Sequence, residues 1–351
     1  MKQQHEALKT LNPNKVWIPT ILGLAFVVYQ FYTDPNLSPS TFRLVSDAKP
    51  WPIILAFLVI IARDAGYVYR IRTLTEKRLS WVRSIYVIIL WEFASAVTPS
   101  VVGGTAVAVF ILLMEGITIG RASAYVMLSS ILDNGFFILF APLVLLYTGQ
   151  SVFPVVDIGS LKLGLSSLFW ISYALIVLYC LIFSYALLIR PSGFKWLLLK
   201  VTSLRPLRKW RRGAYNYGNE IVEASKQLAG KAKGYWIRII VSTIFVWCAR
   251  YTMLNCLISA YADVDFTEQM GIFGKQIIMW IIMLVSPTPG SSGTAEYFFT
   301  QFFNGYLGDY TFITSILWRS LSYYPYLIIG AIFLRPWLVH SLKNRSKEQK
   351  N

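Results

Sequence analysis

Long apolar segments alternate along the chain with short polar ones, and six of them predict membrane-spanning helices. A helix needs roughly 20 apolar residues to cross the hydrocarbon core of a bilayer. Residues 171–188, for example, contain no charged side chain. The pattern therefore indicates an all-α polytopic membrane protein. Its predicted spans are residues 16–32, 51–69, 122–148, 165–189, 237–261 and 312–335.

Two further apolar segments, 81–115 and 271–304, are interrupted near their middles by Pro, Gly, Ser and Thr. Each half holds roughly 11 to 18 residues, or about 16–27 Å of helix, which is shorter than the roughly 30 Å hydrocarbon core. We expect two re-entrant helical hairpins, whose longer legs raise a looser count to about eight spans. The expected breaks are at Pro99, Gly103 and Gly104 in the first hairpin and at Pro287, Pro289, Gly290 and Gly293 in the second.

A repeated pattern relates the two halves of the chain. Val-Thr-Pro-Ser at 97–100 matches Val-Ser-Pro-Thr at 285–288, and an Ala-Arg pair lies ahead of each hairpin, at Arg63 and at Arg250. Small residues and proline also recur by chance, but a broken hairpin and an arginine recur here in register. Inverted repeats with broken helices near the midplane are a transporter architecture. We predict one transmembrane domain, 1–351, with inverted repeats at about 16–148 and 165–335.

The basic residues predict the orientation of these spans. The net charge is +16, yet only 14% of the residues are charged, against about 25% in soluble proteins. The Lys and Arg side chains concentrate before the first span, after the second, in the loop 190–236 and in the C-terminal tail. The positive-inside rule then places both termini and this loop in the cytoplasm of a plasma (inner) membrane protein. We expect the loop to meet anionic lipid headgroups rather than nucleic acid.

Seven charged side chains within the predicted spans and hairpins are functional candidates, because a charge there costs roughly 2.5–3.5 kcal/mol on insertion scales. They are Arg63, Asp64, Glu92, Asp133, Arg250, Glu296 and Arg319. Arginine binds phosphate through a planar, bidentate fork, so Arg63 and Arg250 are the predicted lipid-phosphate ligands. The other five are predicted to contact the headgroup or to gate access.

Structural roles remain open for several of these residues. Arg63 and Asp64 are close enough to the end of their span to extend toward the cytoplasm. Glu296 follows the second break by three residues, where a carboxylate caps the new helix. Glu92 and Asp133 equally suit structural ion pairs with arginines.

The chain carries no motif of a soluble enzyme. Its two histidines lie in polar tails, and neither a phosphate-binding Gly-rich loop nor a metal-spaced cysteine pair is present. We therefore expect no metal, no cofactor and no catalytic residue of a known type. One acidic pair, Asp263 and Asp265, is reminiscent of metal-binding pairs in lipid-linked glycosyltransferases, although a solvated outer loop is the simpler interpretation.

The stretch Pro-Thr-Pro-Gly-Ser-Ser-Gly-Thr-Ala-Glu at 287–296 resembles the Pro-Thr-Pro-Gly-Gly-x-Gly-x-x-Glu signature of the lysylphosphatidylglycerol synthase transmembrane family, also called flippase-like proteins. Ser291 replaces the second Gly. The motif at 98–104 is similar to that family's first broken segment. The resemblance implies movement of a modified phospholipid between leaflets. The family's soluble synthase domain is not expected here, because only 14 residues, most of them polar, follow Trp337.

The function predicted from these features is a lipid flippase or transporter that moves a phospholipid or a polyprenyl-linked lipid between leaflets. One alternative is a membrane glycosyltransferase that uses a lipid-linked substrate. The other is a non-catalytic membrane subunit that works with a separate lipid-modifying enzyme.

Overall fold

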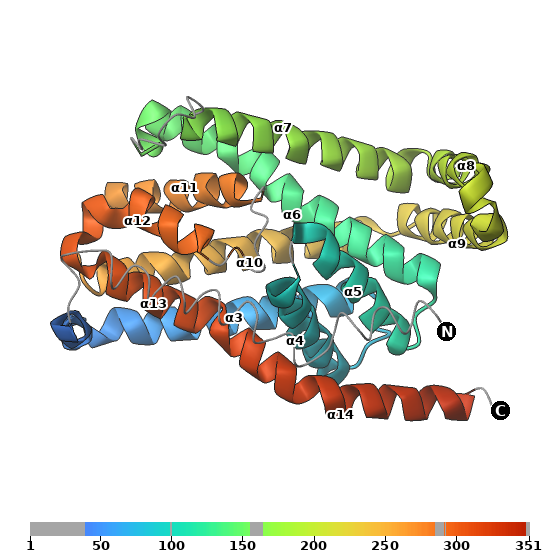
Figure 1. The fold of residues 1–351 in the computed structure, drawn as a ribbon, viewed down its shortest axis with the longest axis horizontal. Coiled ribbons are helices and arrows are strands. Elements are labelled where there is room, and N and C mark those ends of the chain that lie inside the picture. The colour runs from blue at the N-terminus through green and yellow to red at the C-terminus, as the bar shows by residue number, and fades with distance from the viewer. Residues whose placement is uncertain (1–38, 99, 155–163, 285–290, 292, 349–351) are drawn as a thin grey trace.

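The computed structural model describes residues 39–98, 100–154, 164–284, 291 and 293–348, which fold as an elongated bundle of helices (Figure 1). Four of these helices are long and apolar enough to cross a membrane. They match four predicted spans, whereas the predicted span 16–32 lies outside the described residues. The four helices are α3 (Pro50–Leu74), α6 (Ile119–Thr148), α7 (Leu165–Ser184, continued by a π turn at Tyr185–Ile189) and α10 (Lys233–Ser259).

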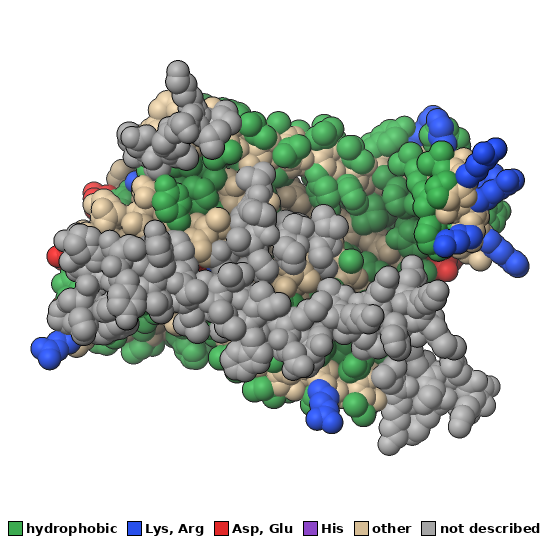
Figure 2. Space-filling view, in the orientation of Figure 1, with side chains coloured by type: hydrophobic (Ala, Val, Ile, Leu, Met, Phe, Trp, Pro, Cys, Tyr) green, Lys and Arg blue, Asp and Glu red, His purple; other side chains and the backbone are tan. Residues whose placement is uncertain are grey.

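The sides of the bundle are largely apolar, and many of its exposed charges lie near the ends. On α7, Trp170, Leu175, Leu178 and Leu181 are all more than half exposed, which suits a surface covered by lipid. Figure 2 shows Lys and Arg gathered over α8 (Pro191–Val201) and α9 (Arg211–Ala229) at one end of the molecule, here called the basic end. The chain is therefore an integral membrane protein, while the cytoplasmic placement of this end stays a prediction.

The first broken segment forms α4 (Trp81–Val97) and α5 (Ser100–Met114). The break follows from Pro99, since the residue before a proline avoids the α conformation, and Thr98 is accordingly extended at ψ 137°. The prediction that Gly103 and Gly104 belong to the break is wrong, because both lie in α5. Gly104 instead allows close packing: a Cβ there would lie 2.7 Å from the Ser95 hydroxyl oxygen of α4.

The second broken segment forms α11 (Phe266–Met283) and α12 (Thr294–Leu307). Gly293 directly precedes α12 with φ +83°, a left-handed conformation that favours glycine. The other expected break residues, Pro287, Pro289 and Gly290, lie outside the described residues. The α4–α5 pair occupies the half of the bundle next to the basic end, and α11–α12 occupies the other half (Figure 1). The inverted repeat and its bounds stay a prediction.

The last predicted span, 312–335, is two helices rather than one. α13 (Thr311–Ser322) ends at Tyr323, whose φ −133° and ψ −60° are not helical, and α14 (Tyr324–Glu348) follows at once. Pro325 explains the break, because a proline is tolerated in the first turn of a helix but not in its interior. The hydrophobic pattern did not predict this break, because the apolar run continues through it.

Two large apolar cores, built from the described residues, stabilise the bundle. One joins α4, α5 and the first half of α6, and the other joins the second half of α6 with α11 and α12. α3 and α10 pack side by side along the bundle, and each contributes to both cores. The space between the cores is where the polar side chains of the interior meet.

Hydrogen bonds to Glu76 connect neighbouring segments at the basic end. The Glu76 carboxylate accepts hydrogen bonds from Lys231 Nζ at 2.6 Å and from the Tyr125 hydroxyl at 3.0 Å. Burial raises the pKa of Glu76, but these two hydrogen bonds outweigh burial and leave the pKa below its ordinary value. The loop between α3 and α4 is thus tied to α6 and to the α9–α10 connection.

Candidate functional site

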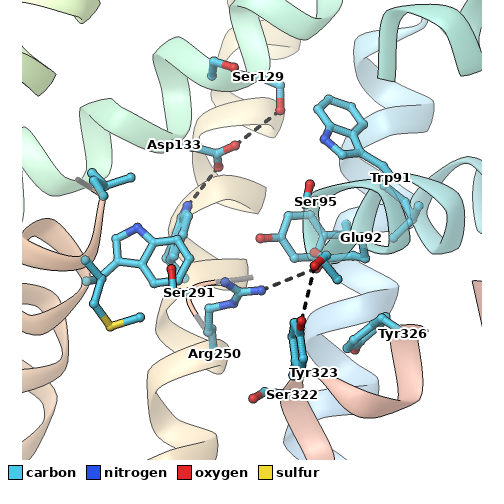
Figure 3. Close-up of a pocket in the computed structure, with 18 of the residues that line it drawn as sticks. Trp91, Glu92, Ser95, Ser129, Asp133, Arg250, Ser291, Ser322, Tyr323 and Tyr326 are labelled. Atoms are coloured by element: carbon cyan, nitrogen blue, oxygen red, sulfur yellow. Dashed lines mark hydrogen bonds and ion pairs between the residues drawn. The ribbon is translucent and has the colours of Figure 1, made fainter. Parts of the chain in front are cut away.

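A cavity of about 330 Å³ opens between the two apolar cores. Side chains of α3, α4, α5, α6, α10, α11, α13 and α14 line it, so both broken segments border it (Figure 3). Most of the lining is apolar or aromatic. Its charged members are Arg70, Glu92, Asp133, Arg250 and Arg319.

Arg70 and Asp133 form the most completely bonded pair of the cavity. Arg70 Nη1 and Nη2 both donate to the Asp133 carboxylate, the latter at 3.0 Å. Arg70 also donates to Ser129 and Thr243. Asp133 accepts a further bond from the Trp247 indole at 2.8 Å. This network joins α3, α6 and α10 and leaves neither charge of the pair uncompensated.

Arg250 and Glu92 face each other across the cavity much more loosely. Arg250 Nη2 lies 3.7 Å from a Glu92 carboxylate oxygen, which is an ion pair without a hydrogen bond. Arg250 Nε is buried without a hydrogen-bond partner. The guanidinium lies 5.3 Å from the ring centres of both Trp247 and Trp280. Two aromatic rings therefore hold this cation while its donors stay largely unused.

Arg319 and Glu296 form a buried pair that belongs to a helix cap. Arg319 Nε donates to Glu296 at 2.7 Å, and the other Glu296 oxygen accepts from the backbone N–H of Gly293 at 2.7 Å. The capping role that the sequence left open for Glu296 is thus observed. Glu296 does not line the cavity, whereas Arg319 does.

Arg63 and Asp64 lie behind the cavity wall. Arg63 is fully buried and donates to Asp64 at 2.6 Å and to the Tyr326 hydroxyl. Tyr326 in turn donates to Asp64 at 2.7 Å and lines the cavity. Neither charged residue of this pair lines it, so the structure does not place Arg63 beside Arg250 in a shared phosphate site.

The structure thus brings four of the seven predicted residues to one cavity: Glu92, Asp133, Arg250 and Arg319. It adds Arg70, which directly follows the predicted span 51–69 and is one of the basic residues behind it. The spacing of Arg63, Tyr67 and Arg70 was the available signal, since residues at i, i+4 and i+7 share one helix face. Tyr67 and Arg70 both line the cavity.

The acidic pair Asp263 and Asp265 has structural partners outside this cavity. Asp263 is paired with Lys49, and its side chain is 94% exposed. Asp265 begins α11 as one half of a capping box with Glu268. Among the described residues, no cluster of His, Cys, Asp and Glu forms a metal site.

Comparison with known proteins now identifies the family. The sequence model of the lysylphosphatidylglycerol synthase TM region matches residues 16–330. The chain belongs to this family. Another similar protein is a UPF0104 membrane protein of Archaeoglobus fulgidus, which is 26% identical over 322 residues that cover 88% of this chain and 93% of the relative. The family match includes every charged residue of the cavity, and the resemblance predicted from the 287–296 motif is confirmed.

Proposed function

We propose that the cavity binds the phosphate of a phospholipid or lipid-linked headgroup and that the chain moves this lipid between the leaflets of the membrane. The observation that supports the proposal is the small number of hydrogen bonds made by Arg250. This arginine is the cavity cation whose described contacts leave hydrogen-bond donors unused, and the ion pair that occupies it is long. A phosphate offers hydrogen-bond acceptors for the unused N–H groups of this planar guanidinium.

The surroundings of Arg250 favour a phosphate over a purely apolar ligand. Trp247 and Trp280 stabilise the charge of the guanidinium by cation–π contacts, which leave its N–H groups available to hydrogen-bond acceptors. A hydrogen bond to a charged group contributes about 1.5–3 kcal/mol, which is enough to select a phosphate.

The size of the cavity suits a headgroup rather than a whole lipid. Its volume of about 330 Å³ lies near the lower end of the range for small-ligand pockets, about 300–1,000 Å³. The acyl chains then stay in the bilayer while the headgroup passes through the protein. Arg63, in this proposal, is a positioning residue that holds Tyr326 in the cavity wall.

The test uses purified protein in phosphatidylglycerol-containing liposomes with a fluorescent phosphatidylglycerol whose outer-leaflet fraction is quenched by dithionite. Arg250→Lys keeps the charge but loses the fork, so at least one charge-assisted hydrogen bond is lost. The expected transport rate is about 10- to 100-fold lower, which corresponds to about 1.5–3 kcal/mol. Arg250→Gln should lower it further.

A matched control comes from the basic end. Arg83 also makes a long ion pair, with Glu115 at 3.8 Å, but neither residue lines the cavity. Arg83→Lys should therefore leave the rate unchanged. An Arg250→Gln variant that folds and translocates the lipid at the wild-type rate would refute the phosphate site. Recovery of chemically altered lipid from the liposomes would instead favour the glycosyltransferase alternative.

A further inference from the structure

Glu92 differs from every other described carboxylate near the cavity. It lies on α4, lines the cavity and is 20% exposed there. Its one described contact with a charged group is the 3.7 Å ion pair with Arg250, and it accepts no described hydrogen bond. Its oxygens therefore keep unused acceptor sites directed at the cavity (Figure 3).

The other carboxylates near the cavity already accept hydrogen bonds from neighbouring groups. Asp133 accepts hydrogen bonds from Arg70 and Trp247. Asp64 is bonded to Arg63 and Tyr326, and Glu296 to Arg319 and the backbone of Gly293. A proton on any of these carboxylates would remove the negative charge that strengthens its existing hydrogen bonds. A proton on Glu92 would weaken no described hydrogen bond.

The charges of the interior balance before a ligand enters. Arg63, Arg70, Arg250 and Arg319 each have one carboxylate partner. A phosphate that binds Arg250 adds a negative charge and leaves the Glu92 carboxylate without its counter-ion. An uncompensated charge in a buried site costs several kcal/mol, so phosphate and ionised Glu92 compete for Arg250.

We propose that Glu92 takes up a proton from water when a lipid phosphate binds Arg250, so that the anionic lipid and the proton cross the membrane together. The proton goes onto a Glu92 carboxylate oxygen, no other bond is made or broken, and the phosphate replaces Glu92 as the counter-ion of Arg250. The proposal rests on the proposed function and adds a driving force, because a proton gradient would then move the lipid.

The other charged and titratable groups around Glu92 fit this assignment. Arg63, Tyr67 and Arg70 of α3 and Tyr326 of α14 lie within electrostatic reach of its carboxylate. The arginines among them are paired, and the tyrosines are neutral near pH 7. Glu92 is thus the group whose protonation restores the balance of charge. A headgroup with an amine would supply that positive charge itself and leave Glu92 ionised.

The experiment counts protons taken up on binding, without transport. The full chain, purified in detergent, is titrated with dihexanoyl-phosphatidylglycerol by calorimetry near pH 7 in two buffers of different ionisation enthalpy. We expect uptake of about one proton per ligand in the wild type, with an affinity that rises up to about tenfold for each pH unit of acidification. Glu92→Gln should bind with no proton uptake and no such pH dependence.

Two controls isolate the role of Glu92. Glu115→Gln removes a carboxylate from a similarly long arginine pair outside the cavity and should keep the wild-type proton count. Dihexanoyl-phosphatidylethanolamine, which carries an amine, should bind the wild type without proton uptake.

The outcomes separate the two proposals. Absence of phosphatidylglycerol binding to the wild type would overturn the proposed function itself. Binding without proton uptake, or unchanged uptake in Glu92→Gln, would overturn only the proton site. If Glu92→Gln does not fold, Glu92→Asp keeps an ionisable group, and its acid carbonyl band in infrared difference spectra of binding should be shifted from the wild-type band. An unshifted band would assign the proton to another group.

Discussion

The Arg70–Asp133 pair allows a quantitative test of how charges are stabilised in this bundle. We consider Arg70→Gln, which removes the cation and most of its donors. Asp133 then keeps the indole N–H of Trp247 at 2.8 Å and a long bond from Ser129 at 3.4 Å. A carboxylate that was neutralised by a buried guanidinium is left with two neutral donors.

The expected loss of unfolding free energy follows from how deeply the pair is buried. Removal of one partner from a buried ion pair costs about 3–5 kcal/mol. Asp133 retains 24% side-chain exposure toward the cavity, and its remaining hydrogen bonds offset part of the cost, so we expect about 2–3 kcal/mol. At about 2 °C per kcal/mol for a chain of this size, Tm should fall by about 4–6 °C.

The assay is thermal unfolding of detergent-purified protein, followed by tryptophan fluorescence and by the monodisperse fraction after heating. Arg70→Gln with Asp133→Asn removes both charges and should recover at least half of the lost Tm. Lys49→Gln, in the exposed pair with Asp263, should leave Tm unchanged. A wild-type Tm for Arg70→Gln, or a double variant that loses the sum of the two single losses, would refute the reasoning.

Three further predictions follow from other parts of the bundle. Single cysteines at Glu115 and Asp309, at opposite ends of the bundle, should react with a membrane-impermeant maleimide from opposite sides of the membrane; labelling of both from one side would contradict the predicted topology. Gly330→Leu should lower Tm by several degrees, because a Cβ there would lie 2.3 Å from Phe93 Cβ and would force α14 away from α4; a Tm equal to that of wild type would show that the helices have room. Although burial raises the pKa of Glu76, its hydrogen bonds lower it below the ordinary value. The stabilisation by Glu76 is therefore present above the ordinary glutamate pKa and is lost as the pH falls through the lower pKa of the folded state. Between neutral and acidic pH, Tm should fall less in Glu76→Gln than in wild type.

The sequence predicted the parts of the fold that follow from local physics. Long apolar runs predicted α3, α6, α7 and α10, because only a helix of that length satisfies its backbone inside a bilayer. The first helix break was predictable from Pro99, whose effect on the preceding residue is steric and local. The family was predictable because its motif at 287–296 is contiguous in sequence.

The candidate site was predicted only in part, because ion pairing between helices is a tertiary property. The cost of a charge in a membrane singled out Glu92, Asp133, Arg250 and Arg319 from the sequence alone. Which carboxylate pairs with which arginine depends on how the helices pack, and no spacing along the chain encodes that. Arg70 was missed because a cation near the end of an apolar run looks like part of the flanking loop, although here its helix continues for one more turn to Leu74.

The order of the charged residues along the chain has a consequence for biosynthesis. A helix that enters the membrane with an unpaired charge does so at a cost of roughly 2.5–3.5 kcal/mol. Arg63 and Asp64 are adjacent, so α3 carries this cation together with its counter-ion when it leaves the translocon. Arg70, by contrast, stays unpaired until α6, which carries Asp133, has been synthesised, and Glu92 stays unpaired until α10, which carries Arg250, has been synthesised. A nascent chain that stops before α10 therefore holds an unmatched carboxylate in the bilayer, which gives membrane quality control a physical means of distinguishing it from the finished protein.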